Sequence, residues 1–167
     1  MITKTSIKCI FFSVSILFLH GCSVNTYDVK EMEYIHHGET AINETSIFVF
    51  RENSAFGAAR KFAIICNDTV MGVLTPGTFC NFDVESGENE IVAYMSPSPI
   101  MHYRVQSRPG EGVFLFCKMG YATGMYIEEI DKNEAEKLMN KYKYMEIGIE
   151  NQKTKINYRD YYDNLYK

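Results

Sequence analysis

Short runs of β-branched and aromatic residues, separated by turn signals, recur through most of this 167-residue chain. The clearest run spans 78–85, where Cys80, Phe82 and Val84 alternate with polar residues. Strict alternation is typical of a β-strand with one buried face. Eight runs predict strands: 47–51, 62–66, 70–74, 78–85, 90–95, 103–108, 113–121 and 125–130. Strands at this spacing predict a mainly β fold, an antiparallel β-sandwich of about seven to eight short strands.

Turn and cap residues mark the ends of these runs. Asn67-Asp68-Thr69 lies between two of them and predicts a hairpin, and Pro76-Gly77 suits the centre of a type II turn. After the last run, Asp131 and Glu134 have the spacing of a helix capping box. An apolar stripe with helical spacing follows, made of Ala135, Leu138, Met139 and Tyr142. We therefore expect one C-terminal α-helix whose apolar side packs on a sheet.

The first residues of the chain have a different character. Lys4 and Lys8 precede an apolar run over 9–19, which ends at Gly21-Cys22. A basic start, a short apolar run and a small residue before the break are typical of a secretory signal peptide. The run is too short to cross a bilayer, which takes roughly 20 apolar residues. Residues 1–21 are therefore predicted to be removed.

The break resembles the lipobox of bacterial lipoproteins. Leu19 and Gly21 stand where the lipoprotein signal peptidase recognises its substrate, and Cys22 follows. The resemblance implies that the thiol of Cys22 takes up diacylglycerol, that its freed amine takes an N-acyl chain, and that no other cofactor is needed. Ser23 at the next position implies the outer membrane, with the domain facing the periplasm. An ordinary secretory signal with a chance cysteine, or an uncleaved anchor, is the alternative.

Removing the leader changes the charge and organisation of the chain. The net charge falls from −4 to −6 because Lys4 and Lys8 are lost with no acid. An acidic chain with scattered basic residues is not expected to bind nucleic acid.

We divide the mature chain into a lipidated N-terminus and polar tether (22–44), a β-sandwich domain with its closing helix (45–145), and a polar tail (146–167). The tail is rich in tyrosine, at Tyr158, Tyr161, Tyr162 and Tyr166.

Three cysteines lie inside the predicted domain, each in an apolar run: Cys66, Cys80 and Cys117. One interpretation makes them small hydrophobic core residues. The other makes one pair, at most, a disulfide, since exported proteins fold in an oxidising compartment. A metal site is not expected, because neither His36-His37 nor His102 supplies the usual ligand spacing.

The order of elements resembles a domain-of-unknown-function family found in bacterial lipoproteins and other exported proteins. The resemblance covers 45–142, from the Ile-Phe-Val-Phe-Arg run at 47–51, through the Pro-Gly-Glu-Gly turn at 109–112, to the helix that begins at Asp131. It implies an all-β sandwich and an envelope location, and it transfers no catalytic residues.

Residues with catalytic chemistry are few, and no catalytic constellation is predicted. A cell-wall or glycan hydrolase would have to use Asp83, Glu85 or His102. The leading hypothesis is a non-enzymatic role, in which the anchored domain binds an envelope protein or assembles within the envelope. Glycan binding is the other alternative. Tyrosine favours interfaces, so the tail is expected either to dock on a protein or cell-wall glycan, or to pack on its own domain.

Overall fold

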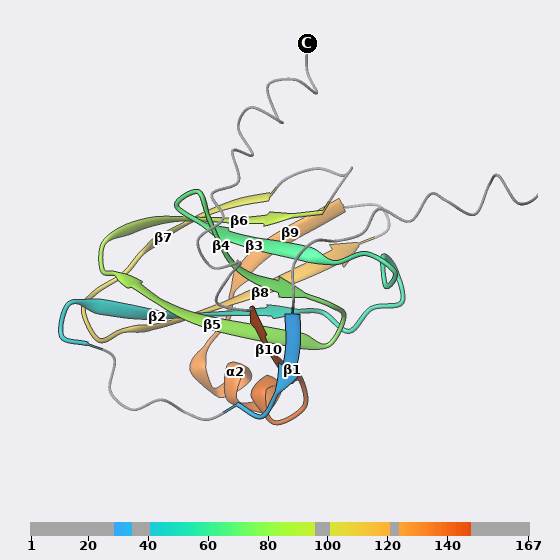
Figure 1. Ribbon diagram of the computed structural model, residues 1–167. Helices are drawn as coiled ribbons and strands as arrows, with labels where there is room; N and C mark the ends of the chain where they lie inside the picture. The colour runs from blue at the N-terminus through green and yellow to red at the C-terminus, as the bar shows by residue number, and fades with distance from the viewer. Residues whose placement is uncertain (1–28, 35–40, 96–100, 121–123, 148–167) are drawn as a thin grey trace, which may run out of the picture.

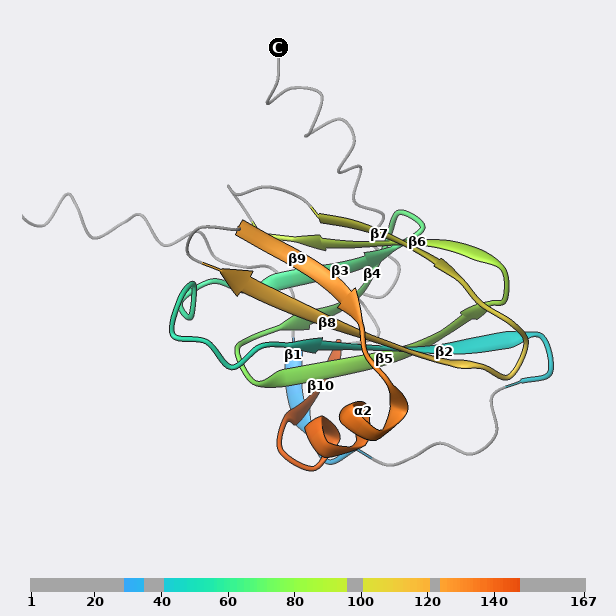
Figure 2. The same ribbon diagram turned by 180° about the vertical axis from the view of Figure 1, so that it is seen from behind.

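The computed structural model describes residues 29–34, 41–95, 101–120 and 124–147. Within these ranges the chain forms two stacked β-sheets and one helix (Figures 1 and 2). The elements in chain order are β1 (Val29–Met32), β2 (Glu44–Arg51), β3 (Phe62–Cys66), β4 (Thr69–Leu74), β5 (Thr78–Glu85), β6 (Glu88–Tyr94), β7 (Met101–Gln106), β8 (Gly112–Gly120), β9 (Gly124–Glu129), α2 (Lys132–Met139) and β10 (Lys143–Ile147). The prediction of a mainly β chain closed by a helix is confirmed.

The two sheets differ in how their strands are joined. Sheet A has six strands in the order β1-β10-β5-β2-β8-β9, and sheet B has four in the order β4-β3-β6-β7. Sheet B is antiparallel throughout, as predicted. In sheet A, β2 runs parallel to β8 and β5 runs parallel to β10, so the expectation of a purely antiparallel fold is corrected. The chain passes through sheet B before β8 and through α2 before β10, and such connections do not impose the antiparallel pairing of a tight hairpin.

The main core lies between the sheets, where alternate residues of the strands meet. Most of its side chains are aliphatic, and several have no exposed surface, including Ile47, Ile64, Ile91 and Leu115. We call this cluster the sandwich interior. The alternation predicted over 78–85 is confirmed, because Cys80 and Phe82 face this interior.

A second cluster lies on the opposite side of sheet A, between the sheet and α2. Figure 1 shows the helix on that side of the sheet. Its buried members on the strands are phenylalanines, and we call the cluster the aromatic layer: Phe48, Phe50, Phe79 and Phe116. The helix covers it with Ala135, Leu138 and Met139, as the apolar stripe predicts. Asp131 is the N-cap and accepts a hydrogen bond from the backbone N–H of Glu134 at 2.9 Å, which confirms the predicted start of the helix.

The predicted turns form as expected. Asn67 and Asp68 join β3 to β4 as a two-residue loop, and both have positive φ, which suits the twist of a tight hairpin. Gly77 has a φ of +71° after Pro76, as a type II turn requires.

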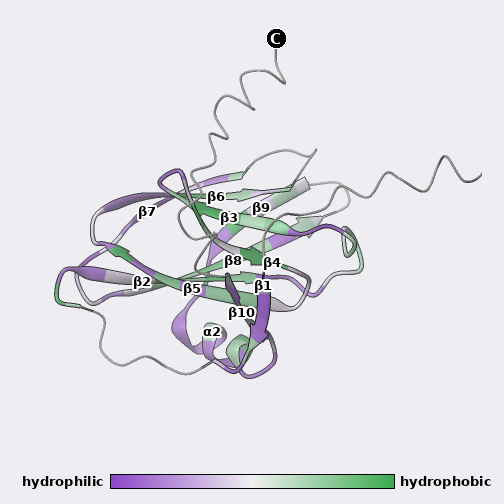
Figure 3. Ribbon diagram, in the orientation of Figure 1, coloured by the Kyte–Doolittle hydropathy of each residue, from purple (hydrophilic) through white to green (hydrophobic). Residues whose placement is uncertain are grey.

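Two strands arise where the sequence predicts none, which raises the strand count within the described ranges to ten. Strand β1 lies inside 22–44, expected to be a polar tether, and β10 takes in Glu146 and Ile147 from the expected tail. The two pair with each other, Val29 opposite Ile147 and Met32 opposite Tyr144. Figure 3 shows that β1 is largely hydrophilic. Its strand form therefore depends on backbone pairing with β10 rather than on an apolar pattern of its own.

Arg51, at the end of β2, is buried and ties a loop to the fold. Its guanidinium donates hydrogen bonds to the carbonyl oxygens of Gly57, Arg60 and Leu74, and lies 3.8 Å from the centre of the Phe62 ring. Burial lowers the pKa of this guanidinium to about 10. The side chain therefore fixes the segment 52–61 against the ends of β3 and β4.

Candidate functional site

One groove bordered by described residues has a volume of about 1110 Å³ and lies on the outer side of sheet A, beside α2. We call it the α2 groove. Strands β2, β5 and β8 form its floor, and the helix and the residues just before it form one wall. Tyr34, which follows β1, and Glu44, at the start of β2, lie at its other border. This volume lies just above the roughly 300–1,000 Å³ that is typical of small-molecule sites.

The strand register explains why the floor is aromatic and open. Phe48 stands opposite Phe114 on the parallel neighbour β8, and their rings stack at 5.2 Å between centres. The neighbouring pair on the same face of these two strands joins Ser46 to Gly112, which has no side chain. A methyl group at Gly112 would lie 3.1 Å from the Phe114 ring, so the missing side chain leaves room above the floor.

Carboxylates surround this apolar floor. Ser46 donates a hydrogen bond to Asp83, which lies directly opposite on β5. Glu44 and Glu136 line other parts of the groove, and Lys132 is a basic residue of the rim, 4.0 Å from Glu136. The charged side chains that line the groove are therefore mainly acidic, and favour a ligand that carries positive charge.

Tyr34 closes one end of the groove by packing on the aromatic layer. Its ring lies 5.4 Å from that of Phe79 and 5.2 Å from that of Tyr144, both edge to face. Burial raises the pKa of the Tyr34 hydroxyl, and the nearby Asp83 carboxylate raises it further. Tyr34 belongs to the range expected to be a tether, so the structure adds a residue to the site that the sequence did not suggest.

Of the residues named for a hydrolase, Asp83 and Glu85 share one face of the fold, whereas His102 lies on another. Asp83 and Glu85 project from β5 on the outer side of sheet A, because the alternate residues of that strand face the interior. His102 lies on β7 in sheet B, and its neighbours Met101 and Tyr103 face the interior, so His102 points to the opposite outer side. The sandwich therefore separates His102 from the two carboxylates, so a site that joined His102 to either of them is not formed.

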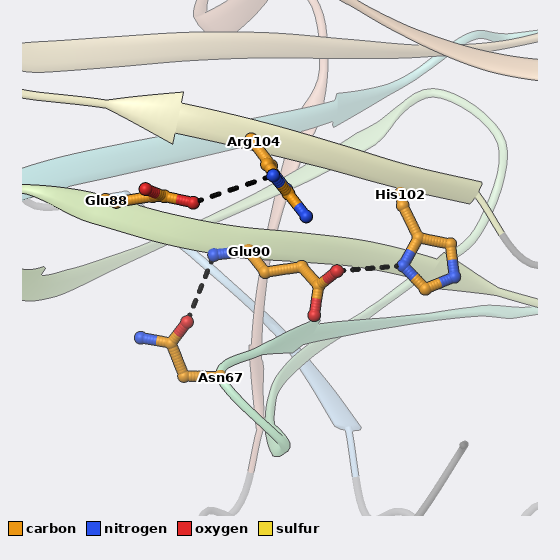
Figure 4. Close-up of polar contacts among 5 residues, drawn as sticks. All are labelled: Asn67, Glu88, Glu90, His102 and Arg104. Atoms are coloured by element: carbon orange, nitrogen blue, oxygen red, sulfur yellow. Dashed lines mark hydrogen bonds and ion pairs between the residues drawn. The ribbon is translucent and has the colours of Figure 1, made fainter.

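His102 instead belongs to a polar cluster along β6 and β7, shown in Figure 4. Its Nδ1 atom lies 3.1 Å from Oε1 of Glu90, and the backbone N–H of Glu90 donates to Asn67 at 3.0 Å. Arg104 and Glu88 form a looser pair at 3.9 Å, both well exposed. The cluster follows the cross-strand register of β6 and β7 and borders the outer face of sheet B.

The three cysteines of the described domain are core residues. Cys66, Cys80 and Cys117 are free thiols buried in the sandwich interior, so no pair of them is bridged in this structure. Burial raises the pKa of the Cys66 and Cys117 thiols to about 12, and raises that of Cys80 as well. Thiolates are the reactive form, so these side chains act as inert small hydrophobes.

Several predicted features lie outside the described residues. They include the signal peptide (1–21), the recognition residues Leu19 and Gly21, the lipidation site Cys22, and the tyrosines of the tail. Over the described ranges, no group of three or more possible metal ligands occurs, and the single helix is too short to cross a membrane.

The sequence offers one partial signal for the groove. Alternation along 78–85 puts Asn81 and Asp83 on the polar side of their strand, and both line the groove. The partners Ser46 and Phe114 come from strands whose pairing with β5 and β2 only the fold reveals. The resemblance to an exported domain family stays a prediction. No protein-family model, no curated protein and no solved structure matches this chain.

Proposed function

We propose that this protein is an envelope lipoprotein with a non-enzymatic binding role, and that the α2 groove is its binding site. The groove carries this proposal, since it combines an aromatic floor with a carboxylate rim on one face of the fold. In this proposal, diacylglycerol and an N-acyl chain on Cys22 hold the chain in the outer membrane, facing the periplasm. Two or more acyl chains make membrane attachment stable.

If Cys22 is lipidated, the pairing of β1 with the fold leaves a shorter link to the membrane than a polar tether over 22–44 would. Only 23–28 lie between Cys22 and Val29. Seven residue steps span at most about 25 Å when fully extended. The bilayer is therefore within a short reach of the domain, and the ligand is expected near the membrane surface.

The chemistry of the groove favours a protein segment that carries basic and apolar side chains. The Phe114 ring offers an apolar surface, and Asp83, Glu44 and Glu136 offer negative charge around it. A segment with an apolar side chain between two lysines or arginines would contact both the ring and the carboxylates. A mature chain with a net charge of −6 disfavours polyanions as ligands.

A peptide titration tests this assignment in the purified full-length protein. The probes are an octapeptide of alternating lysine and leucine, and a matched peptide of glutamate and leucine. Asp83→Asn and Glu136→Gln should each weaken binding of the lysine peptide about three- to ten-fold, an effect that shrinks with added salt. Glu88→Gln, on the outer side of sheet B, is the control and should leave affinity unchanged. Equal binding of both peptides, or an equal effect of the control, would refute the assignment.

The anchor is tested separately in cells. Cys22→Ala should accumulate an unprocessed precursor and abolish palmitate incorporation, because the thiol that accepts diacylglycerol is missing. Cys66→Ala is a matched control, since this thiol is buried in the domain. Normal cleavage and labelling of the Cys22 variant would contradict the lipoprotein assignment and leave the groove assignment standing.

Glycan binding is the second candidate, because the groove also joins a stacked aromatic pair to amide and carboxylate groups. Phe114 supplies an aromatic surface, and Asn81 and Asp83 supply hydrogen-bonding groups beside it. Titration with a soluble cell-wall muropeptide distinguishes the two candidates. Saturable binding of the muropeptide, abolished by Asn81→Ala, together with no binding of the lysine peptide, would favour the glycan.

A further inference from the structure

The segment that joins β2 to β3, residues 52–61, exposes apolar side chains on a folded loop. Phe56 has 47% of its surface exposed, and Ala55, Ala58 and Ala59 are exposed beside it. Of the exposed large hydrophobic side chains that the structure describes, only Phe56 and Ile42 lie outside the strands and the helix. We call 52–61 the Phe56 loop.

The base of the Phe56 loop is fixed to the fold. The Arg51 guanidinium donates to the carbonyl oxygens of Gly57 at 2.9 Å and Arg60 at 2.6 Å. Gly57 has a φ of +71°, and a Cβ at this position would lie 2.4 Å from Sδ of Met119 on β8. The loop can therefore pack closely on β8 because Gly57 has no side chain, while Phe56 stays exposed.

Backbone groups at the tip of the loop are already hydrogen-bonded. The N–H of Ala58 donates to the carbonyl oxygen of Ala55 at 3.2 Å, and the N–H of Phe56 donates to Oγ of Ser54 at 3.2 Å. A backbone group without a partner is costly in apolar surroundings. The tip can therefore leave water without giving up these bonds.

Two exposed basic residues, Arg60 and Lys61, follow the apolar tip. The loop also contains the acidic residue Glu52, which is only half-buried. Its carboxylate accepts a hydrogen bond from the backbone N–H of Met119 at 3.2 Å. The Phe56 loop therefore combines an aromatic side chain with two exposed positive charges, and its carboxylate is engaged with β8.

The opposite end of the sandwich has the opposite charge. Figures 1 and 2 show the start of β2 at one end of the fold and the loop between β2 and β3 at the other. Ile42, which precedes β2, is 89% exposed. Arg108 is a basic residue of this end, whose carboxylates outnumber it: Glu44, Glu85, Glu88 and Glu111. An anionic surface therefore attracts the Phe56 loop and repels the end that carries Ile42.

We infer that the Phe56 loop is a membrane-binding site for a bilayer that contains anionic phospholipid. Phe56 enters the boundary between headgroups and acyl chains, and Arg60 and Lys61 bind the lipid phosphates. Apolar residues next to basic ones are typical of segments that bind the surface of anionic membranes. The inference rests on the proposed lipid anchor only because the anchor brings a bilayer near the domain, and it does not depend on the α2 groove.

The chain contains no tryptophan, so one introduced tryptophan is a clean reporter in the purified full-length protein. The probes are vesicles of phosphatidylglycerol and phosphatidylcholine with brominated acyl chains, which quench a tryptophan that enters the bilayer. Phe56→Trp should be quenched about three-fold or more strongly than Ile42→Trp, the control at the acidic end. Vesicles of phosphatidylcholine alone should reduce this difference, because they lack the negative charge that attracts the loop.

A second comparison tests the basic residues in the Phe56→Trp reporter. Arg60→Gln combined with Lys61→Gln should reduce the quenching by about half or more, because the attraction to lipid phosphate is lost. Arg104→Gln combined with Arg108→Gln removes the same charge from β7 and the turn after it, and should not reduce the quenching.

Three results would overturn the inference. Equal quenching of Phe56→Trp and Ile42→Trp would show that the loop has no preference for the bilayer. An equal loss in both charge variants would assign the attraction to net charge rather than to the loop. A change in Phe56→Trp fluorescence that needs envelope proteins and does not occur with vesicles would assign the loop to a protein partner. Because the vesicles are added to purified protein, each of these results leaves the Cys22→Ala test of the anchor unaffected.

Discussion

The sandwich interior and the aromatic layer lie on opposite sides of the same sheet and are built differently. The interior is mainly aliphatic and is closed on both sides by strands, with Ile47 and Leu115 fully buried. The aromatic layer is closed on one side by strands and on the other by an eight-residue helix, whose Leu138 and Met139 are only partly buried. One cluster is therefore sealed between sheets, whereas the other is covered over part of its area.

The difference explains where a site can form. Two sheets with alternating side chains fill the space between them, whereas a short helix covers only the part of a sheet that it crosses. Beside α2, the rings of Phe48 and Phe114 form the floor of the α2 groove. We expect the interior to determine global stability and the aromatic layer to determine local stability around the groove.

Truncation of one leucine in each cluster is expected to give the largest difference in stability. Leu115→Ala should lower the free energy of unfolding by about 2–5 kcal/mol, because it leaves a cavity among fully buried side chains. Leu138→Ala should cost about 1 kcal/mol, because its side chain already contacts solvent. Urea denaturation of both variants measures the difference. Equal losses would show that the helix is as tightly packed as the interior.

A methyl group added to a glycine gives an intermediate effect. At Gly72 a Cβ would lie 2.5 Å from Sγ of Cys80, so Gly72→Ala should cost about 1–3 kcal/mol through overpacking. At Gly112 the nearest atom is the end of the Phe114 ring, which can turn aside, so Gly112→Ala should cost less than about 1 kcal/mol. Thermal unfolding of both variants tests which substitution costs more stability. A larger loss of stability for Gly112→Ala would show that the chain is packed more tightly around Gly112 than around Gly72.

The smallest effect concerns the helix cap. Asp131→Ala removes the acceptor for the backbone N–H of Glu134 and should cost about 1 kcal/mol. Hydrogen exchange should accelerate in α2 while β2 and β8 keep their protection. Asp131→Asn, which keeps a capping oxygen, is the matched control. Faster exchange throughout both sheets would mean that the aromatic layer and the interior unfold as one unit.

Local sequence patterns predicted the elements that carry their own signal. Each of the eight predicted runs is a strand within three residues of its expected bounds, and the helix begins at its predicted cap. Strands β1 and β10 were missed because Val-Lys-Glu-Met and Lys-Tyr-Met-Glu-Ile lack a regular apolar alternation. They are strands because they pair with each other across a separation of more than a hundred residues, and because β10 also pairs with β5.

The sequence by itself determined which residues alternate, where the chain turns and which helical face is apolar, because these properties depend on neighbours within a few positions. Tertiary structure alone decided that β2 lies between β5 and β8, which brings Ser46 to Asp83 and Phe48 to Phe114. It also put Asp83 and His102 on opposite outer sides. Pairing between distant strands depends on the packing of whole sheets, so no local pattern contains it.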